Sequence, residues 1–255
     1  LIQVYRMMNS GEAVGFVSAP ADFQHAEEIG QGNLDVKIQL KDPAELSHLA
    51  TTLNKMTQDL KENLIHITNM SKAKEKIEAG LSVAHNIQKD ALPNDFPKNP
   101  NFELIASMNP ARDVGGDFYD FFFIDDTHFA FVMADVSGKG ITAALFMMSA
   151  KTMIKNILQS GCSLEQAAKK VNKGLYDNHS RGMFLTAFIC VLDLQTGEVH
   201  YINAGHCPPL IRSESGYQYL EPLRNLMLGI MPTYEYQIGS FKLKANERIF
   251  LYTDG

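Results

Sequence analysis

Residues 111–140 read ARDVGGDFYDFFFIDDTHFAFVMADVSGKG, and this stretch decides the fold. Within it, two runs rich in aromatic and β-branched residues, 118–124 and 129–134, predict two strands joined by a short polar turn. An aspartate stands beside glycines at the outer end of each run, at Asp117 and Asp135. Glycines at such junctions let a backbone or a ligand come close, so we expect both carboxylates to point off the edge of a sheet.

The alternation of short strands and turns continues through the chain after Pro93. The strand candidates are 102–106, 118–124, 129–134, 187–192, 199–203, 209–212, 217–220, 236–243 and 248–252. Two helices, 142–159 and 164–176, fall between them, and a capping box that begins at Ser163 opens the second. Because strands cluster with strands and helices with helices, the sequence predicts an α+β architecture with antiparallel sheets.

A third aspartate of this kind, Asp254, stands in the run 251–255. Any one Asp-Gly junction is typical of an ordinary turn. Three carboxylates that converge on one edge would repel each other unless a cation lay between them. Only oxygen ligands are available at suitable spacing, which favours hard divalent ions such as Mg²⁺ or Mn²⁺ over zinc. The pattern therefore predicts a metal site at Asp117, Asp135 and Asp254.

The front half of the chain predicts one long helix. A helix start with a capping box stands at 42–45, apolar residues then recur at three- and four-residue spacing up to Ala91, and Pro93 ends the run. At 1.5 Å per residue such a helix measures about 70 Å. Its length and period favour a parallel coiled-coil dimer over the alternative of a single amphipathic helix lying on its own domain. The polar positions of the predicted seam are Asn63, Lys74 and Gln88.

The residues before this helix carry a second pattern. The run AEEIGQGNLDV at 26–36 and the acidic, apolar rhythm of 45–60 resemble a HAMP module, the dimeric helix pair that relays signals behind a membrane helix in bacterial sensors. The resemblance covers residues 21–65, whereas residues 1–20 fit it poorly, so a remnant or missing segments are expected there and a membrane anchor is expected upstream. The predicted domains are a HAMP-like module at 1–65, a coiled-coil linker at 66–92 and a catalytic domain at 93–255.

Composition limits the partners. Hydrophobic residues make up 45% of the chain, enough for a substantial core, and the net charge of −6 comes with no basic stretch interleaved with aromatics, so nucleic acid is not an expected partner. The three cysteines are far apart, which argues against zinc or disulfides and for a reducing cytosol. No apolar run reaches the ~20 residues of a membrane helix, and no signal peptide is visible.

Four motifs follow one another in the back half of the chain. They are Ala-Arg-x-Val-Gly-Gly-Asp-x-Tyr-Asp at 111–120, Asp-Val-x-Gly-x-Gly at 135–140, Asn-Ala-Gly-His-x-Pro at 203–208 and Tyr-Thr-Asp-Gly at 252–255. In this order they resemble the SpoIIE-type branch of the PPM metal-dependent phosphatases, over residues 84–255. The resemblance implies a PPM-type α-β-β-α sandwich. It also implies final strands and a further metal-binding aspartate beyond Gly255, so a domain truncated at its C-terminus is expected.

The resemblance implies a role for each acidic residue. Asp135 would bridge two Mn²⁺ or Mg²⁺ ions, the backbone carbonyl of Val136 would bind one of them, and Asp254 would bind the other. Asp117 would bind a metal directly or hold metal-bound water. Two such ions can activate a bridging water for in-line attack on a phosphoryl group, so no covalent intermediate is required.

Each of two further residues, Arg112 and His206, has two possible roles. Arg112 matches the arginine that grips substrate phosphate in this superfamily, since its planar guanidinium suits a bidentate contact; the alternative is a surface salt bridge to Asp113 or Asp120. His206 is a candidate general acid. The resemblance implies that its turn follows a strand far from the aspartates, so we expect a structural role in holding that turn.

The predicted function is a protein serine/threonine phosphatase that acts on a phosphorylated anti-sigma-factor antagonist at the inner face of the bacterial membrane. A rotation or register change in the dimeric HAMP and coiled-coil stalk would move the helix end near 84–92 and order or disorder the metal loops. The alternative is a non-catalytic signalling module whose phosphatase-like fold only binds a partner. The residues that weigh against this alternative are the intact Asp117, Asp135, Asp254 and Arg112.

Overall fold

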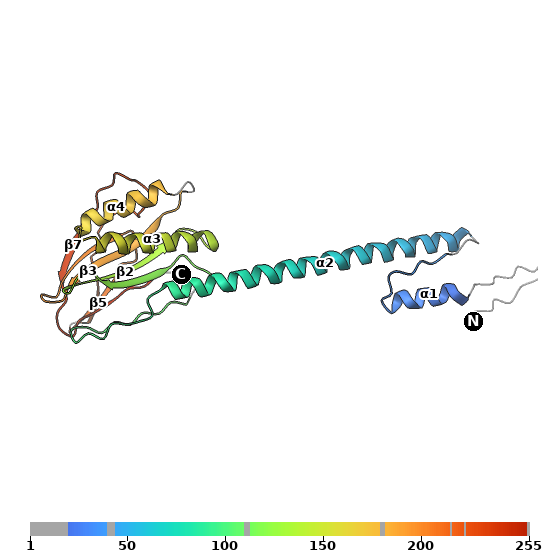
Figure 1. The fold of residues 1–255 in the computed structure, drawn as a ribbon, viewed down its shortest axis with the longest axis horizontal. Coiled ribbons are helices and arrows are strands. Elements are labelled where there is room, and N and C mark those ends of the chain that lie inside the picture. The colour runs from blue at the N-terminus through green and yellow to red at the C-terminus, as the bar shows by residue number, and fades with distance from the viewer. Residues whose placement is uncertain are drawn as a thin grey trace, which may run out of the picture. The chain divides into compact units, whose positions relative to one another are not determined.

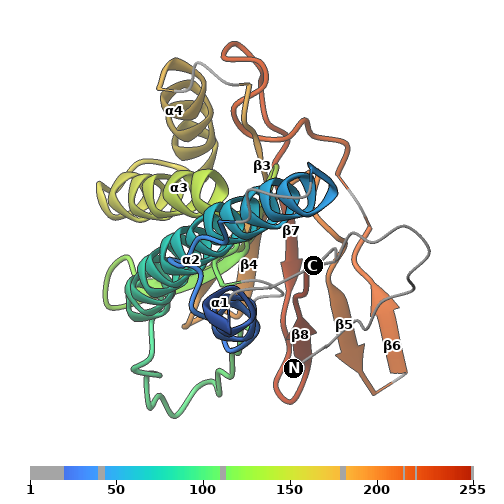
Figure 2. The same ribbon diagram turned by 90° about the vertical axis from the view of Figure 1, so that its right-hand side faces the viewer.

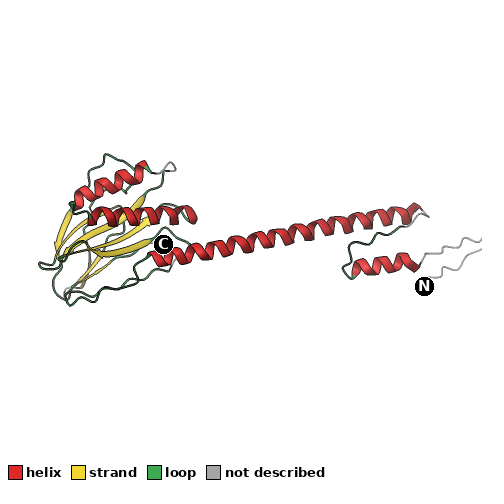
Figure 3. Cartoon of the chain, viewed as in Figure 1, coloured by secondary structure: helices red, strands yellow, loops and turns green. Residues whose placement is uncertain are grey.

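The computed structural model describes residues 20–39, 44–109, 113–178, 182–214, 216–221 and 223–253. The chain forms two compact units, Leu1–Ile77 and Glu78–Gly255, and helix α2 (Ala44–Ala91) contributes to both (Figures 1 and 3). The long helix predicted from the apolar rhythm is therefore confirmed, although its predicted capping residues at 42–43 lie outside the described residues. In the described ranges, no helix is long and apolar enough to cross a membrane.

In the first unit, the side chain of Asn54 fixes the connector between α1 (Pro20–Gly30) and α2. The backbone amide of Ile38 donates to Asn54 Oδ1 at 2.9 Å, and Asn54 Nδ2 donates to the Ile38 carbonyl at 2.7 Å. The Ile38 side chain is buried, and Lys61 of α2 pairs with Asp35 of the connector. Two helices with a docked connector agree with the HAMP-like sequence pattern.

Within the described residues of the second unit, the strands form two antiparallel sheets (Figure 2). The larger sheet has the order β1-β2-β3-β4-β7 and comprises β1 (Phe118–Phe123), β2 (His128–Val136), β3 (Leu185–Asp193), β4 (Glu198–Ala204) and β7 (Gly239–Lys242). The smaller sheet has the order β6-β5-β8 and comprises β5 (Leu210–Ser213), β6 (Gly216–Tyr219) and β8 (Arg248–Phe250).

Side chains alternate between the two faces of the larger sheet. Even-numbered residues of β1 and β2, such as Phe118 and Val132, are buried in one core with Phe146 of the helical layer. That layer consists of α3 (Ile141–Gln159) and α4 (Leu164–Asp177), which lie on one side of the sheet in Figure 1. The opposite face carries Phe188, which packs with Ile249 of the smaller sheet. The order of layers is helices, larger sheet, smaller sheet, as the α+β sandwich requires.

A buried ion pair links β1 to α3. Lys151 Nζ lies 2.9 Å from Asp120 Oδ2, and the two side chains expose only 13% and 3% of their surface. Asp120 Oδ1 also accepts a hydrogen bond from the Phe121 amide at 3.0 Å. Asp120 therefore faces the helical layer, where its partner is Lys151.

One predicted strand is absent, and two are shorter than predicted by at least two residues. Residues 102–106 form no strand; in that described segment only the isolated bridge between Asn99 and Phe102 occurs. Phe102 instead packs on Phe129 with ring centroids 4.6 Å apart, so the segment covers the sheet without pairing to it. The shortened candidates are 236–243, which pairs only as β7, and 248–252, which pairs only as β8.

Candidate metal centre

The pairing of β1 with β2 brings Asp117 and Asp135 together. Phe118 is the register partner of Ala134, so one further step along both chains sets Asp117 opposite Asp135. Residues directly opposite each other in an antiparallel pair have Cβ atoms about 4.5–5.5 Å apart and point to the same face. Two carboxylates that are separated in the sequence by the β1–β2 hairpin thus meet at one edge of the sheet.

Gly116 shows that the two chains stay close beyond the last strand pair. A Cβ built on Gly116 would lie 2.9 Å from the carbonyl oxygen of Val136 and 3.0 Å from its Cβ. Real side chains do not tolerate a contact of 2.9 Å to a backbone atom, so only glycine fits here. The carbonyl of Val136, a predicted ligand, therefore lies beside the residue that precedes Asp117.

Both carboxylates lie on the face of the larger sheet opposite to the face that packs on α3. Asp135 is on the same side of β2 as Phe131, which packs on the cluster around Phe188 between the sheets. Asp117, as the partner of Asp135, shares that side. Both aspartates are half-buried.

The donors at this edge fit a hard divalent cation. Like charges directly opposite on neighbouring strands repel, and a cation between two carboxylates removes that repulsion. The described residues supply two carboxylates and the Val136 carbonyl, and contain no group of three or more His, Cys, Asp or Glu side chains suited to a metal. The predicted ligand Asp254 and the predicted phosphate-binding residue Arg112 lie outside the described residues.

The loop after β2 is tied to the start of β3. The amide of Ser137 donates to the Phe184 carbonyl at 2.9 Å, and the Phe184 amide donates to Ser137 Oγ at 2.9 Å. Gly138 and Gly140 have φ values of 93° and 75°, a region that residues with side chains rarely adopt. The Ser137 hydroxyl closes this reciprocal pair and fixes the loop next to Asp135.

The last turns of α2 hold the segment that leads into Asp117. Gln88 Nε2 donates to the Gly115 carbonyl at 2.6 Å, and the Gly115 amide donates to Gln88 Oε1 at 3.0 Å. His85 Nδ1 lies 2.5 Å from the Asp113 carbonyl oxygen. The Gln88 side chain is buried, so the prediction that Gln88 is a polar residue of a coiled-coil seam is wrong. A heptad position does not reveal whether its partner belongs to the same chain.

His206 lies much nearer to the aspartates than the sequence suggested. Thr186 is the register partner of Asp135, and its hydroxyl donates to the Asp135 carbonyl at 3.4 Å. His206 Nδ1 lies 3.0 Å from the same hydroxyl oxygen. The backbone amide of His206 donates to Asn203 Oδ1 at 2.7 Å, which agrees with a role in the turn. The expectation that this turn is distant from the aspartates is wrong, because β3 lies next to β2 and carries the connecting residue.

The cysteine nearest to the centre of the fold is not suited to nucleophilic chemistry. Cys190 is fully buried between the sheets, and burial raises the pKa of its thiol well above the ordinary value. Its sulfur donates to the Phe131 carbonyl at 3.3 Å. A thiolate at this position is therefore strongly disfavoured, and Cys190 acts as a core residue.

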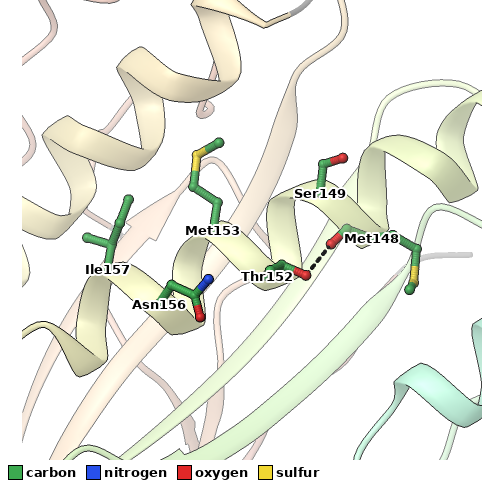
Figure 4. Close-up of a pocket in the computed structure, with 6 residues that line it drawn as sticks. All are labelled: Met148, Ser149, Thr152, Met153, Asn156 and Ile157. Carbon is green, nitrogen blue, oxygen red and sulfur yellow. Dashed lines mark hydrogen bonds between the residues drawn. The ribbon is translucent and has the colours of Figure 1, made fainter.

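An open hollow of about 550 Å³ runs along α3 (Figure 4). The residues that line it are Met148, Ser149, Thr152, Met153, Asn156 and Ile157. Because α3 packs on the face of the sheet that Asp120 occupies, this hollow lies on the other side of the sheet from Asp117 and Asp135. It is not part of the candidate metal centre.

Comparisons with known protein families and curated proteins agree on two regions. The family described as Stage II sporulation protein E (SpoIIE) matches residues 125–255, and the HAMP domain family matches residues 24–62. Protein IcfG of Synechocystis is 28% identical over 90% of this chain and 40% of its own length. Phosphoserine phosphatase RsbU of Bacillus subtilis is 29% identical over 71% of this chain and 54% of its own length. The chain thus spans about half the length of these relatives.

Solved structures also resemble part of this chain. The RsbU and RsbW domains of Rv1364c from Mycobacterium tuberculosis share 28% identity with a TM-score of 0.51, over 59% of this chain and 41% of that chain. The SiaA-PP2C domain of Pseudomonas aeruginosa gives a TM-score of 0.57 over 72% of this chain and 74% of that chain, at 20% identity. At that identity the second likeness establishes the fold alone, which is the PP2C-like arrangement of stacked sheets and helices.

Proposed function

Because this chain belongs to the Stage II sporulation protein E (SpoIIE) family, we propose that it catalyses metal-dependent hydrolysis of phosphoserine or phosphothreonine on a protein substrate. One observation carries the proposal: the β1–β2 register sets Asp117 opposite Asp135 at a half-buried edge, with the Val136 carbonyl held close by Gly116. The similarity to a curated phosphoserine phosphatase supports the same reaction class.

The described residues supply the scaffold for this chemistry. Asp135, Asp117 and the Val136 carbonyl would hold the metal ions, and Asp254 is the proposed further ligand. Two bound Mn²⁺ or Mg²⁺ ions would activate a water and neutralise charge on the phosphoryl oxygens. Arg112 would orient the phosphate through a bidentate contact. Cys190 is buried with a raised thiol pKa, which supports a mechanism without a covalent cysteine intermediate.

The proposed substrate is a phosphorylated anti-sigma-factor antagonist. RsbU and RsbP of Bacillus subtilis, both named phosphoserine phosphatases, are 29% identical to this chain over 71% and 69% of it. A phosphoserine on a small folded protein reaches an edge site more easily than it would reach the bottom of a deep pocket. It must reach the metals while it is still attached to its domain. The sequence contains no basic stretch that would favour nucleic acid as a partner.

The HAMP-like unit and α2 are proposed to form a dimeric stalk. The apolar seam residues of α2 are strongly exposed in the single chain, with 50% exposure at Leu49, 62% at Met56 and 60% at Met70. A continuous row of exposed apolar side chains at heptad spacing is stabilised when a second helix buries it. The match of residues 24–62 to the HAMP family supports the same arrangement, since that module is a dimer of helix pairs.

This stalk is proposed to lie behind an upstream membrane segment, at the cytoplasmic face of the bacterial membrane. HAMP modules in sensors commonly connect a membrane helix to an output domain, and residues 24–62 match that family. The input would then pass along α2 to its last turns, where Gln88 holds Gly115. A rotation of α2 changes the position of that side chain, and with it the segment that carries Asp117.

The direct test of the reaction uses the full-length protein with Mn²⁺ and a phosphoserine peptide. Release of inorganic phosphate, with little release from the matching phosphotyrosine peptide, is the expected result. Supplying the phosphorylated antagonist from the same organism should increase kcat/KM over the peptide, because a folded partner adds contacts outside the phosphate. Absence of phosphate release with either Mn²⁺ or Mg²⁺ would favour the non-catalytic signalling module.

Gln88→Leu tests the coupling between α2 and the metal centre. The substitution removes both hydrogen bonds to Gly115 and leaves its half-buried backbone groups without these partners, which costs about 1–3 kcal/mol of stability. We expect kcat to fall about 10- to 100-fold, because small displacements of catalytic groups have effects of this size. Phosphate release and thermal unfolding are measured in parallel.

Asn86→Leu is the matched control for this variant, since Asn86 is an exposed amide two residues away on the same helix. It should leave both turnover and stability close to those of the wild type. If Gln88→Leu also keeps wild-type turnover, the helix does not act on the metal centre through Gln88.

A further inference from the structure

A chain of hydrogen bonds runs from the metal centre through β3 to His206. The Thr186 hydroxyl donates to the Asp135 carbonyl at 3.4 Å, and its oxygen lies 3.0 Å from His206 Nδ1. His206 exposes only 8% of its surface, and Thr186 is half-buried. The three groups come from β2, β3 and the turn after β4, so the chain spans three neighbouring strands of the larger sheet.

Both contacts of the Thr186 hydroxyl can be hydrogen bonds at the same time in only one arrangement. A hydroxyl has a single hydrogen, and in this arrangement that hydrogen is donated to the Asp135 carbonyl. The Thr186 oxygen then accepts a hydrogen from His206, which requires that Nδ1 carries a proton. Nδ1–H of His206 thus orients the hydroxyl, and the hydroxyl holds the carbonyl of Asp135.

The turn that carries His206 is itself fixed. The His206 amide donates to Asn203 Oδ1 at 2.7 Å, and the Asn203 side chain is buried. Gly205 has a φ of 70°, and a Cβ there would lie 2.8 Å from Cγ of Met227. The ring of His206 is therefore presented to Thr186 by a turn with little freedom to shift.

We propose that His206 is a positioning residue for the metal centre, acting through Thr186. By holding the Asp135 carbonyl, it sets the backbone at the end of β2, from which the Asp135 carboxylate and the Val136 carbonyl project. The inference rests on the proposed function of that site. The bond between Thr186 and Asp135 is long, so the hydroxyl alone holds the carbonyl weakly, and the second partner is needed to keep it directed.

Metal affinity provides a readout that is separate from turnover. Partners behind the ligands of a metal typically contribute 10- to 100-fold to affinity. We therefore expect Thr186→Val and His206→Leu each to weaken Mn²⁺ binding by about that factor, measured by titration calorimetry on the full-length protein. Thr186→Ser keeps the hydroxyl, and His206→Asn places an amide donor near the Nδ1 position. Both conservative variants should bind Mn²⁺ nearly as well as the wild type.

The double variant tests whether the two residues act as one unit. Thr186→Val combined with His206→Leu should bind Mn²⁺ no more weakly than the worse single variant, because each change already breaks the same chain. His200→Leu, at an exposed histidine of β4 that pairs with Val191, is the control and should leave affinity unchanged. If His206→Leu does not fold, the Thr186 series still decides, since valine and threonine have similar shapes.

Two results would overturn the positioning role. One is unchanged Mn²⁺ affinity in both His206→Leu and Thr186→Val, with only the unfolding temperature lowered. The other is equal loss of affinity in Thr186→Ser and Thr186→Val, which would show that the hydroxyl is irrelevant. A wild-type protein that neither binds Mn²⁺ nor releases phosphate would instead refute the proposed function itself.

Discussion

Asp135→Asn is expected to lower kcat/KM for phosphate release by about three orders of magnitude or more, equivalent to about 4 kcal/mol of transition-state stabilisation. The substitution keeps the size of the side chain but removes the negative charge opposite Asp117, so the edge no longer holds two divalent ions. Chelation of Mn²⁺ by EDTA should reduce activity to the same background. Activity is measured as inorganic phosphate released from a phosphoserine peptide, with and without added Mn²⁺.

Asp126→Asn is the matched control for this variant. Asp126 is an exposed aspartate in the turn between β1 and β2, at the end of the hairpin opposite to Asp135. It should retain wild-type activity and the same response to EDTA. Phosphate release that persists in Asp135→Asn and in EDTA would rule out the metal-dependent mechanism.

Gly116→Ala is expected to lower kcat about 100-fold with little change in the overall fold. The added methyl group would lie 2.9 Å from the Val136 carbonyl oxygen, so either that carbonyl or the segment leading to Asp117 must move. Either movement displaces a proposed ligand by several tenths of an ångström. Excess Mn²⁺ should recover part of the activity if the displacement mainly weakens metal binding, and this is tested by titrating Mn²⁺ in the activity assay.

Gly80→Ala separates this effect from a general effect of replacing glycine. A Cβ on Gly80 meets no atom within 4 Å, and the residue lies inside α2. Alanine should therefore stabilise the helix by up to about 1 kcal/mol and leave kcat unchanged. Wild-type turnover in Gly116→Ala would mean that the close approach of the two chains does not matter for catalysis.

The sequence predicted most of the regular structure because its signals are local. Aromatic and β-branched runs marked β1 to β4, and the apolar rhythm of α2 together with the Ser163 cap marked the helices; Ser163 Oγ accepts from the Gln166 amide as predicted. The prediction of a strand at 102–106 was wrong, and the burial pattern explains why. Its side chains do alternate between half-buried and exposed, but among the described residues no strand pairs with it. Alternation reports which face is covered, and it does not report hydrogen-bond partners.

The candidate site was predicted in its acidic residues and missed in its supporting ones. Glycine-flanked aspartates can be recognised in one dimension, and the register then places Asp117 opposite Asp135. The contacts of Gln88 with Gly115 and of His206 with Thr186 join residues 27 and 20 positions apart, respectively. The first contact depends on where the last turns of α2 lie, and the second on the pairing of β3 with β2 and β4. Neither leaves a local pattern that could be read from the sequence.

The buried pair between Asp120 and Lys151 constrains how these two positions can diverge among descendants of this gene. Replacing one member alone leaves an unpaired charge in the core and lowers the stability of the fold by about 3–5 kcal/mol. Exchanging both for apolar residues of similar volume changes the stability little. Neither residue can therefore drift by itself. A lineage that replaces Lys151 must already have neutralised Asp120 or must replace it in the same step, so the two sites are expected to vary as a couple.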